Sequence, residues 1–254
     1  GAALQTGIFA SVQLSQIQAT LVIPCWCESA RLPQFLRELA ADIAASPLIV
    51  EVLVVDDGSP EAEVTATRSV VAAVTKQYRF VRPMHSLPHQ GKGGAIYAGW
   101  RSGASSSRWL AFVDADGAVP AAEVVRGLRH VIASGDDQQI LAASRYHQDC
   151  SRKVRRGFIR QRSGGWFANW AKRKLKIGAD DSQCGFKIVP AAWWRAQGPW
   201  SELGYAFDLE LLVAARNGQV TITNFPIAWQ EIGGSNVTWR DGMQLVEAVK
   251  RLRT

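Results

Sequence analysis

The chain of 254 residues is 47% hydrophobic and 20% charged, which is typical of a folded globular protein and excludes wholesale disorder. It has no run of about eighteen apolar residues and no recognisable signal peptide, so we expect neither a transmembrane helix nor a cleaved leader. The net charge of +7 is concentrated in residues 151–178, which hold ten basic and no acidic residues; the rest of the chain therefore carries a net charge of −3.

Strand-like and helix-like patterns alternate over the first 145 residues. Strands are predicted at residues 19–24, 50–55, 80–81, 109–113 and 140–144. Helices are predicted at residues 31–45, 61–77, 93–103 and 121–133. This alternation predicts an α/β fold with a Rossmann-like, mainly parallel sheet flanked by helices, in which ligands bind beyond the carboxyl ends of the strands. After residue 145 the pattern becomes irregular, and we expect that part to hold the site of a second substrate.

Pairs of carboxylates follow two of the predicted strands. Asp114 and Asp116 come directly after residues 109–113, and Asp56 and Asp57 end the strand at 50–55. Aspartate is a common turn and helix-capping residue, so either pair alone could be structural. Two such pairs at the same edge of one sheet favour a nucleotide and metal site, because Mg²⁺ and Mn²⁺ prefer oxygen ligands.

Two further features are compatible with phosphate chemistry. The glycine-rich segment 89–94 opens a predicted helix, so its backbone amides and Lys92 could meet a phosphate, although the spacing of a Walker A loop is absent. It could equally be a plain helix-opening turn. Asp208 stands at the head of a predicted apolar helix, where it is either a functional carboxylate or an acid favoured by the helix dipole.

The cysteines and the basic segment bear on location. Cys25 and Cys27 are too close for an ordinary disulfide, and no second pair completes a zinc site, which favours a reduced, cytoplasmic setting. In residues 151–178 the aromatic residues Trp166, Phe167 and Trp170 interleave with the basic ones, a mixture suited to a membrane interface. We therefore expect peripheral association with the inner face of a membrane; a solvated helix face is the alternative. A nucleic-acid-binding module would leave the acidic strand ends unexplained, so no nucleic acid is expected.

Five motifs in this order resemble family 2 glycosyltransferases of the GT-A fold. They are residues 54–59 (VVDDGS), 91–95 (GKGGA), 114–118 (DADGA), 183–187 (QCGFK) and 206–211 (AFDLEL). The sequence is most similar to dolichyl-phosphate β-glucosyltransferases and their bacterial polyprenyl-phosphate relatives, from about residue 19 to the C-terminus. The resemblance implies an inverting, metal-dependent transfer of a sugar from a nucleotide donor, with UDP-glucose expected, to a lipid phosphate. It also implies a single domain over residues 1–254, with 19–145 binding the donor and 146–254 the acceptor.

The resemblance assigns roles to individual positions. The nucleoside would be held by Pro24, Glu28, Asp56 and Asp57. Lys92 and Gln183 would lie near the donor, and Asp114 and Asp116 would hold Mg²⁺ or Mn²⁺ and the donor diphosphate. Arg145 and Arg162 would grip an acceptor phosphate.

Three positions depart from the family pattern. Residues 25–28 (CWCE) replace the usual Ala-Tyr-Asn-Glu, so the nucleoside contacts could differ. Ala118 stands where mannosyl relatives have a glutamine ligand, which favours glucosyl transfer, and Asn236 stands where lysine is frequent.

The chemistry of the acceptor separates two mechanisms. A phosphate monoester is already ionised near neutral pH, so it needs no strong general base, only arginines that hold one anion beside another. A soluble or saccharide hydroxyl acceptor would need a base, and Asp208 is the candidate for that role.

Overall fold

The computed structural model describes residues 17–149, 151–155, 169–233 and 239–252. Within them a seven-stranded sheet has the order β3-β2-β1-β4-β7-β5-β8. Its strands are β1 (Ala19–Cys25), β2 (Val50–Asp57), β3 (His85–Leu87), β4 (Trp109–Val113), β5 (Gln139–Ser144), β7 (Phe186–Pro190) and β8 (Thr221–Pro226). Only β7 runs antiparallel to its neighbours, so the prediction of a mainly parallel sheet is confirmed. A second, two-stranded sheet pairs β6 (Val154–Arg155) with β9 (Trp229–Gln230).

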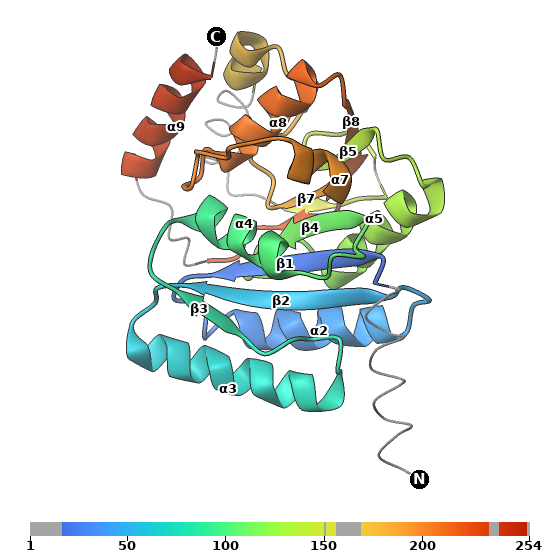
Figure 1. Cartoon of the computed structure of the whole chain (residues 1–254), viewed down its shortest axis with the longest axis vertical. Coiled ribbons are helices and arrows are strands. Elements are labelled where there is room, and N and C mark those ends of the chain that lie inside the picture. Colours follow the sequence, from blue (N-terminus) through green and yellow to red (C-terminus); the bar gives the residue numbers. More distant parts are fainter. Residues whose placement is uncertain (1–16, 150, 156–168, 234–238, 253–254) are drawn as a thin grey trace.

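Helices cover both faces of the large sheet (Figure 1). One face carries α2 (Leu32–Ala44), α3 (Glu61–Gln77) and α5 (Ala121–Ser134). The other carries α4 (Lys92–Ser102), α7 (Ala191–Ala196) and α8 (Phe207–Asn217). The last helix, α9 (Trp239–Arg251), lies beside α8 at the end of the molecule opposite α3 (Figure 1). Residues 169–175 are also helical.

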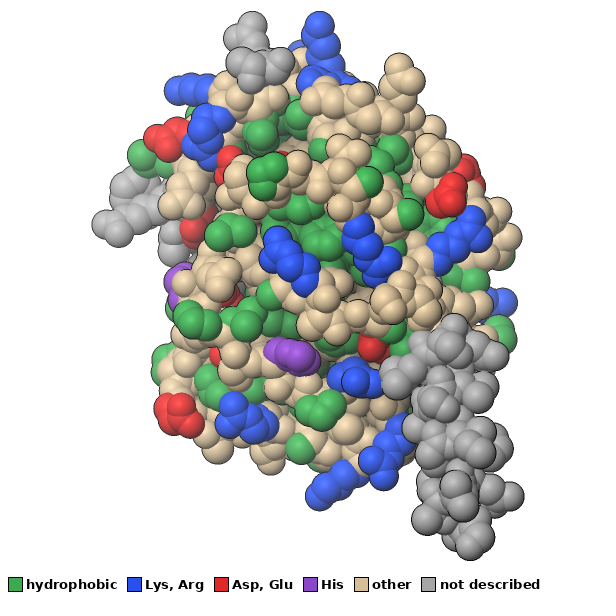
Figure 2. All heavy atoms as spheres, in the orientation of Figure 1, with side chains coloured by type: hydrophobic (Ala, Val, Ile, Leu, Met, Phe, Trp, Pro, Cys, Tyr) green, Lys and Arg blue, Asp and Glu red, His purple; other side chains and the backbone are tan. Residues whose placement is uncertain are grey.

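The surface is of mixed character on the face shown in Figure 2. Lys and Arg side chains are spread from one end of the molecule to the other, with hydrophobic atoms between them. None of the helices that the structure describes is both long and apolar enough to cross a membrane.

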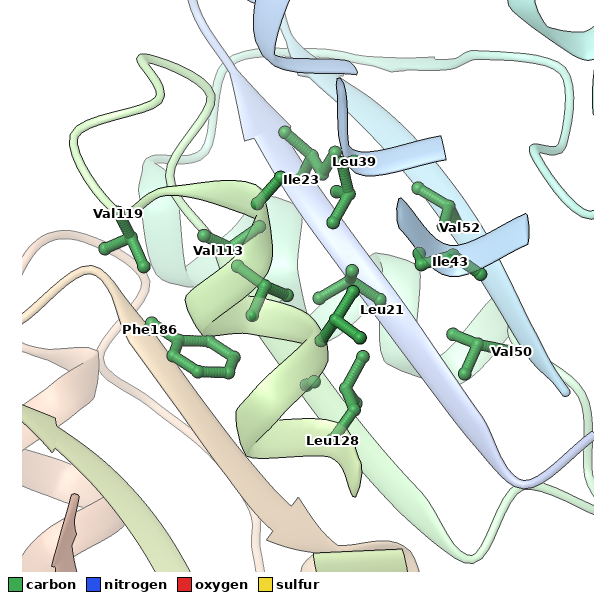
Figure 3. Close-up of a cluster of buried hydrophobic side chains, with 14 of the residues drawn as sticks. Leu21, Ile23, Leu39, Ile43, Val50, Val52, Val113, Val119, Leu128 and Phe186 are labelled. Atoms are coloured by element: carbon green, nitrogen blue, oxygen red, sulfur yellow. The ribbon is translucent and has the colours of Figure 1, made fainter. Parts of the chain in front are cut away.

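The central strands are buried on both sides, as their continuous apolar sequences predict. Successive side chains of a strand point to opposite faces. Leu21 and Ile23 of β1 therefore pack with α2, α3 and α5, in the cluster of Figure 3, whereas Val22 between them packs with α4. In β4 the same alternation sends Val113 to the first cluster and Phe112 to the second. The rigid centre of the sheet thus fixes where its strands end.

One predicted strand was misplaced. Residues 80–81 form no strand; Val81 makes only an isolated bridge to Val52, and the edge strand is β3, five residues further on. The short β3 pairs with the end of β2 through its backbone, and its side chains are exposed or half-buried. Because its side chains are not buried, β3 has no apolar pattern from which it could be predicted. The other predicted elements lie within two residues of the observed ones.

Candidate active site at the carboxyl ends of the strands

A cleft of about 570 Å³ opens where β1, β2 and β4 end. In the parallel register Cys25 lies opposite Asp56, and Val22 lies opposite Phe112, so the residues after β1, β2 and β4 reach one edge. Because β7 is antiparallel, Phe186 lies opposite Val113, and the segment that precedes β7 reaches that edge as well. Six residues predicted from the sequence line the cleft: Pro24, Glu28, Asp57, Lys92, Asp114 and Asp116.

Asp57 holds the glycine-rich loop in place. Its carboxylate accepts hydrogen bonds from the backbone amides of Gln90 at 2.7 Å and Gly91 at 2.9 Å, and His89 Nδ1 lies 2.9 Å from Oδ2. Gly91 has φ +105°, a conformation that side-chain-bearing residues rarely adopt, and its Cα faces the carbonyl oxygen of Leu203. Asp57 therefore positions the loop that starts α4 and sets the wall of the cleft.

Asp56 is more deeply placed, with 1% of its surface exposed. Its Oδ2 accepts a hydrogen bond from the Ser59 amide at 3.1 Å, whereas Oδ1 is buried without a hydrogen-bond partner among the described residues. A buried carboxylate oxygen left open is costly, so it suits a ligand that brings an N–H or O–H. Asp56 is not among the residues that line the cleft.

Asp114 and Lys92 form the central ion pair of the cleft, with Lys92 Nζ 2.5 Å from Asp114 Oδ1. Lys92 is the first residue of α4, and Asp114 directly follows β4. The backbone of Asp114 donates to the Gly185 carbonyl at 2.9 Å, and a Cβ on Gly185 would lie 2.1 Å from Asp114 Oδ2. The glycine before β7 is therefore what leaves room for the carboxylate.

Burial and mutual repulsion act on the carboxyls of the cleft. Burial and then Asp114 raise the pKa of Asp116, whose Oδ1 also accepts the Ala118 amide at 2.9 Å. Burial raises the pKa of Glu28 to about 7, although the adjacent Arg31, whose Nη2 lies 2.5 Å from Glu28 Oε1, acts in the opposite direction. Carboxyls whose charge is this unfavourable attract a cation.

The residues present fit a divalent cation that shares its ligands with a substrate. Among the described residues no three His, Cys, Asp or Glu side chains come together as a complete protein site. Asp114 and Asp116 supply two carboxylates at the cleft wall. Mg²⁺ is commonly held by one or two carboxylates together with substrate phosphates and water, which matches this donor set.

Asp208 lies beneath the cleft and is 3% exposed. Lys187 Nζ lies 2.7 Å from Asp208 Oδ1 and also donates to the carbonyls of Ser182 and Cys184, both at 2.9 Å. Burial raises the pKa of Asp208, while Lys187 and then Lys92 act in the opposite direction. The structure thus places Asp208 in a buried ion pair and outside the cleft lining.

Arg145 lies further along the same edge, directly after β5. Its guanidinium forms a two-pronged ion pair with Asp181, at 2.7 and 2.9 Å, and lies 5.3 Å from the centroid of the Trp229 ring. Burial opposes the charge of Asp181, but Arg145 holds the pKa of that carboxyl below its usual range. Gln183 Nε2 nearby is buried without a hydrogen-bond partner among the described residues. Arg162 lies outside the described residues.

Several residues of the site were not predicted. Arg31, Tyr205, Asp241 and Gln244 line the cleft, the last two from α9. The sequence around α9 gives no signal that this helix contacts a cleft formed mostly by residues far earlier in the chain. Lys187 could have been found, since it is a lone lysine inside the apolar run of β7 and so required a buried partner.

Comparison with known proteins places these features in context. The family model described as "Glycosyl transferase family 2" matches residues 20–193. A dolichyl-phosphate β-glucosyltransferase from Drosophila melanogaster is 31% identical, over 92% of this chain and 74% of its own length. The human protein of the same name is 30% identical, over 87% of this chain and 69% of its own length.

Solved structures share the fold. Glucosyl-3-phosphoglycerate synthase from Mycobacterium tuberculosis, in complex with UDP, superimposes with a TM-score of 0.66 and 16% identity over 95% of this chain and 82% of that one. The same enzyme in complex with Mn²⁺, UDP and glucosyl-3-phosphoglycerate superimposes with a TM-score of 0.65 and 16% identity, over 95% of this chain and 81% of that one. Mannosyl-3-phosphoglycerate synthase from Rubrobacter xylanophilus superimposes with a TM-score of 0.63 and 17% identity, over 94% of this chain and 76% of that one. The fold is therefore GT-A, as predicted.

Proposed function

We propose that this chain, which belongs to glycosyl transferase family 2, transfers glucose with inversion from UDP-glucose to a polyprenyl or dolichyl phosphate. The chain is a hexosyltransferase. The observation that carries the finer assignment is the cleft in which Asp114, Asp116 and Lys92 meet, together with relatives at about 30% identity named dolichyl-phosphate β-glucosyltransferase. Two carboxylates beside a lysine suit the diphosphate of a nucleotide sugar, with a cation between like charges.

The donor is proposed to lie across the ends of β1, β2 and β4. Asp56, with its open oxygen, and Asp57, Pro24 and Glu28 would hold the nucleoside. Asp114 and Asp116 would hold Mg²⁺ or Mn²⁺, which when bound neutralises charge that develops on the leaving diphosphate. Lys92, at the N-terminus of α4, would face the same diphosphate, where the helix dipole adds a further favourable interaction.

In the transfer step a phosphate oxygen of the acceptor attacks the anomeric carbon from the face opposite the donor. A new bond forms between that oxygen and the carbon, and the bond to the donor diphosphate breaks, so UDP leaves with the electron pair. The α-linkage of the donor becomes a β-linkage. No proton has to be removed from an ionised phosphate. The burial of Asp208 and its pairing with Lys187 at 2.7 Å support this version over attack by a hydroxyl, which would need an accessible base.

The acceptor phosphate needs a cationic site, and Arg145 and Arg162 remain our candidates. Arg145 is at the correct edge of the sheet but is held by Asp181. We propose that it acts mainly through that pair, by fixing the segment 181–185 against Asp114, or that it shares its guanidinium with an incoming phosphate. Replacing Arg145 by Lys separates these roles, because lysine keeps the charge and loses the two-pronged geometry.

The proposed function is tested by offering UDP-glucose labelled in the sugar, with Mn²⁺, to polyprenyl phosphate in detergent micelles. We expect label in the lipid fraction, in a β-linkage by NMR of the anomeric carbon. Polyprenol without phosphate serves as the matched acceptor and should stay unlabelled. Transfer to 3-phosphoglycerate or to a sugar hydroxyl, with none to the lipid phosphate, would refute the proposed acceptor.

A further inference from the structure

We propose that Lys92 is a built-in counter-ion of the metal site, which neutralises Asp114 and gives that carboxylate up only when a nucleotide diphosphate enters with the divalent cation. This inference rests on the proposed role of Asp114 and Asp116 as metal ligands. It adds that the cation and the nucleotide bind together, because either one alone leaves a charge in the cleft uncompensated.

The ion pair occupies the position at which a cation would contact Asp114. Lys92 Nζ lies 2.5 Å from Asp114 Oδ1, and the Lys92 side chain is 17% exposed. The ammonium also lies 5.6 to 5.9 Å from the centroids of the Phe112, Tyr205 and Phe207 rings, which limit its contact with water. A cation that approaches Asp114 therefore competes with a charge already in place.

The backbone of Lys92 is fixed, so only its side chain can yield. Gly94, two residues on, donates its amide to the Leu203 carbonyl at 2.9 Å. A Cβ on Gly93 would come within 2.6 Å of both the Glu202 carbonyl and Phe207 Cβ, which shows how closely this turn of α4 packs on its neighbours. A rotation of the lysine side chain can move the ammonium, whereas a shift of the helix would disrupt these contacts.

A second acid near Lys92 is already paired with another lysine. Asp208 acts electrostatically on Lys92, although its own carboxylate is paired with Lys187 at 2.7 Å. Lys187, the close partner of Asp208, lies 5.6 Å from the same Phe112 ring as Lys92. The two lysines thus lie over one ring, each paired with its own aspartate. An ammonium that leaves Asp114 therefore needs the donor phosphate to avoid becoming an isolated buried charge.

This arrangement predicts strong coupling between cation and nucleotide. Without nucleotide, a cation must displace Lys92, and the displaced ammonium has no new anion. With UDP present, the diphosphate receives Lys92, and Asp114 is free for the cation. Since coupling is reciprocal, UDP binding strengthens cation binding by the same factor as the cation strengthens UDP binding.

The experiment measures Mn²⁺ binding to the purified protein by electron paramagnetic resonance, with and without UDP, in the parent and in Lys92→Met. Methionine preserves length among the three rings and removes the charge. We expect Lys92→Met to bind Mn²⁺ about tenfold more tightly than the parent without UDP, and to lose most of the strengthening by UDP. Lys92→Gln serves as a second neutral variant if the methionine variant does not fold.

Arg31→Met is the matched control, because it removes one positive charge from the same cleft but frees Glu28 instead of Asp114. It should change Mn²⁺ affinity without UDP less than about threefold. Equal affinities of parent and Lys92→Met, or an equal gain in Arg31→Met, would overturn the inference. The readout does not involve sugar transfer, so a failure of the lipid acceptor alone leaves it standing. Mn²⁺ binding that does not depend on Asp114 and Asp116 would instead refute the metal site itself.

Discussion

Among the described residues Asp114 is paired with Lys92, whereas no lysine is paired with the Asp116 carboxylate, and burial beside another acid raises the pKa of Asp116. Its role as a metal ligand is tested by Asp116→Asn, which keeps the shape of the side chain and removes the charge. We expect transfer at saturating Mn²⁺ to fall at least about 100-fold, since charge stabilisation by a bound cation contributes several kcal/mol. Turnover is measured with labelled UDP-glucose, and near-normal turnover would exclude Asp116 from the metal site.

Glu28 predicts a pH dependence of stability. Its pKa is about 7 in the folded protein against an ordinary value of 4.5, so the folded state holds its proton over a range where the unfolded state does not. The stability that it contributes is fully present below pH 4.5 and is lost as pH rises through 7. Glu28→Gln should remove this slope and raise the free energy of unfolding at pH 8 by about 1 kcal/mol, allowing for solvent screening.

The measurement is urea unfolding of both proteins at pH 5 and pH 8. The variant should at the same time bind UDP more weakly if Glu28 contacts the nucleoside. If the free energies of unfolding of the parent and Glu28→Gln differ by the same amount at both pH values, Glu28 does not titrate in this range.

Gly185 gives the sharpest steric prediction at the residue scale. An added Cβ would lie 2.1 Å from Asp114 Oδ2, so Gly185→Ala must displace the carboxylate. We expect Mn²⁺ affinity in the presence of UDP to fall about tenfold or more, with a stability loss of about 1–3 kcal/mol. Gly178→Ala is the matched control, because there a Cβ meets only ordinary contact with Ile222 at 3.7 Å. Equal Mn²⁺ affinity in the two variants would contradict the steric account.

Helix α8 holds the loop that covers the start of α4. Glu210 of α8 accepts hydrogen bonds from the Ser201 amide at 2.8 Å and the Glu202 amide at 3.0 Å, and from the Tyr97 hydroxyl at 3.2 Å. This loop leads to Gly204 and Tyr205, which line the cleft. Glu210→Gln replaces one acceptor by a donor that faces other donors, so we expect KM for the sugar nucleotide to rise about tenfold with a smaller change in kcat. An unchanged KM would show that the loop is held without Glu210.

The predictable part of the fold is the part built from regular apolar patterns. The continuous apolar sequences of β1, β2 and β4 predicted these buried strands, and the end of β4 predicted where Asp114 and Asp116 lie. The exposed β3 and the cleft residues on α9 were not predicted, because neither a polar edge strand nor a long-range contact leaves a periodic signal. The pairing of Asp208 with Lys187 was also missed, since neither interpretation of Asp208, as a helix-dipole acid or as a functional base, considered the lone lysine of β7.

For the whole molecule, the basic segment 151–178 is the feature that bears on membrane association. In its described part Arg152 is paired with Glu123 and Lys172 with Asp180, while Trp170 packs against the core beside α8. The exposed cations of the helix at residues 169–175 and the turn after it are Arg173, Lys174 and Lys176. We expect these three residues to meet an anionic surface.

The membrane prediction is therefore tested by replacing Arg173, Lys174 and Lys176 together with Gln. Each basic residue near an anionic membrane contributes about 1 kcal/mol, less when screened. Binding to vesicles with about one third phosphatidylserine should therefore weaken at least about tenfold. The matched control replaces Lys76, Arg79 and Arg82, which are also exposed and lie at or just after the end of α3, far from α9 (Figure 1). Sedimentation with vesicles measures binding in both variants. Equal losses would mean that net charge alone attracts the protein, and binding that ignores anionic lipid altogether would refute the surface role of the segment.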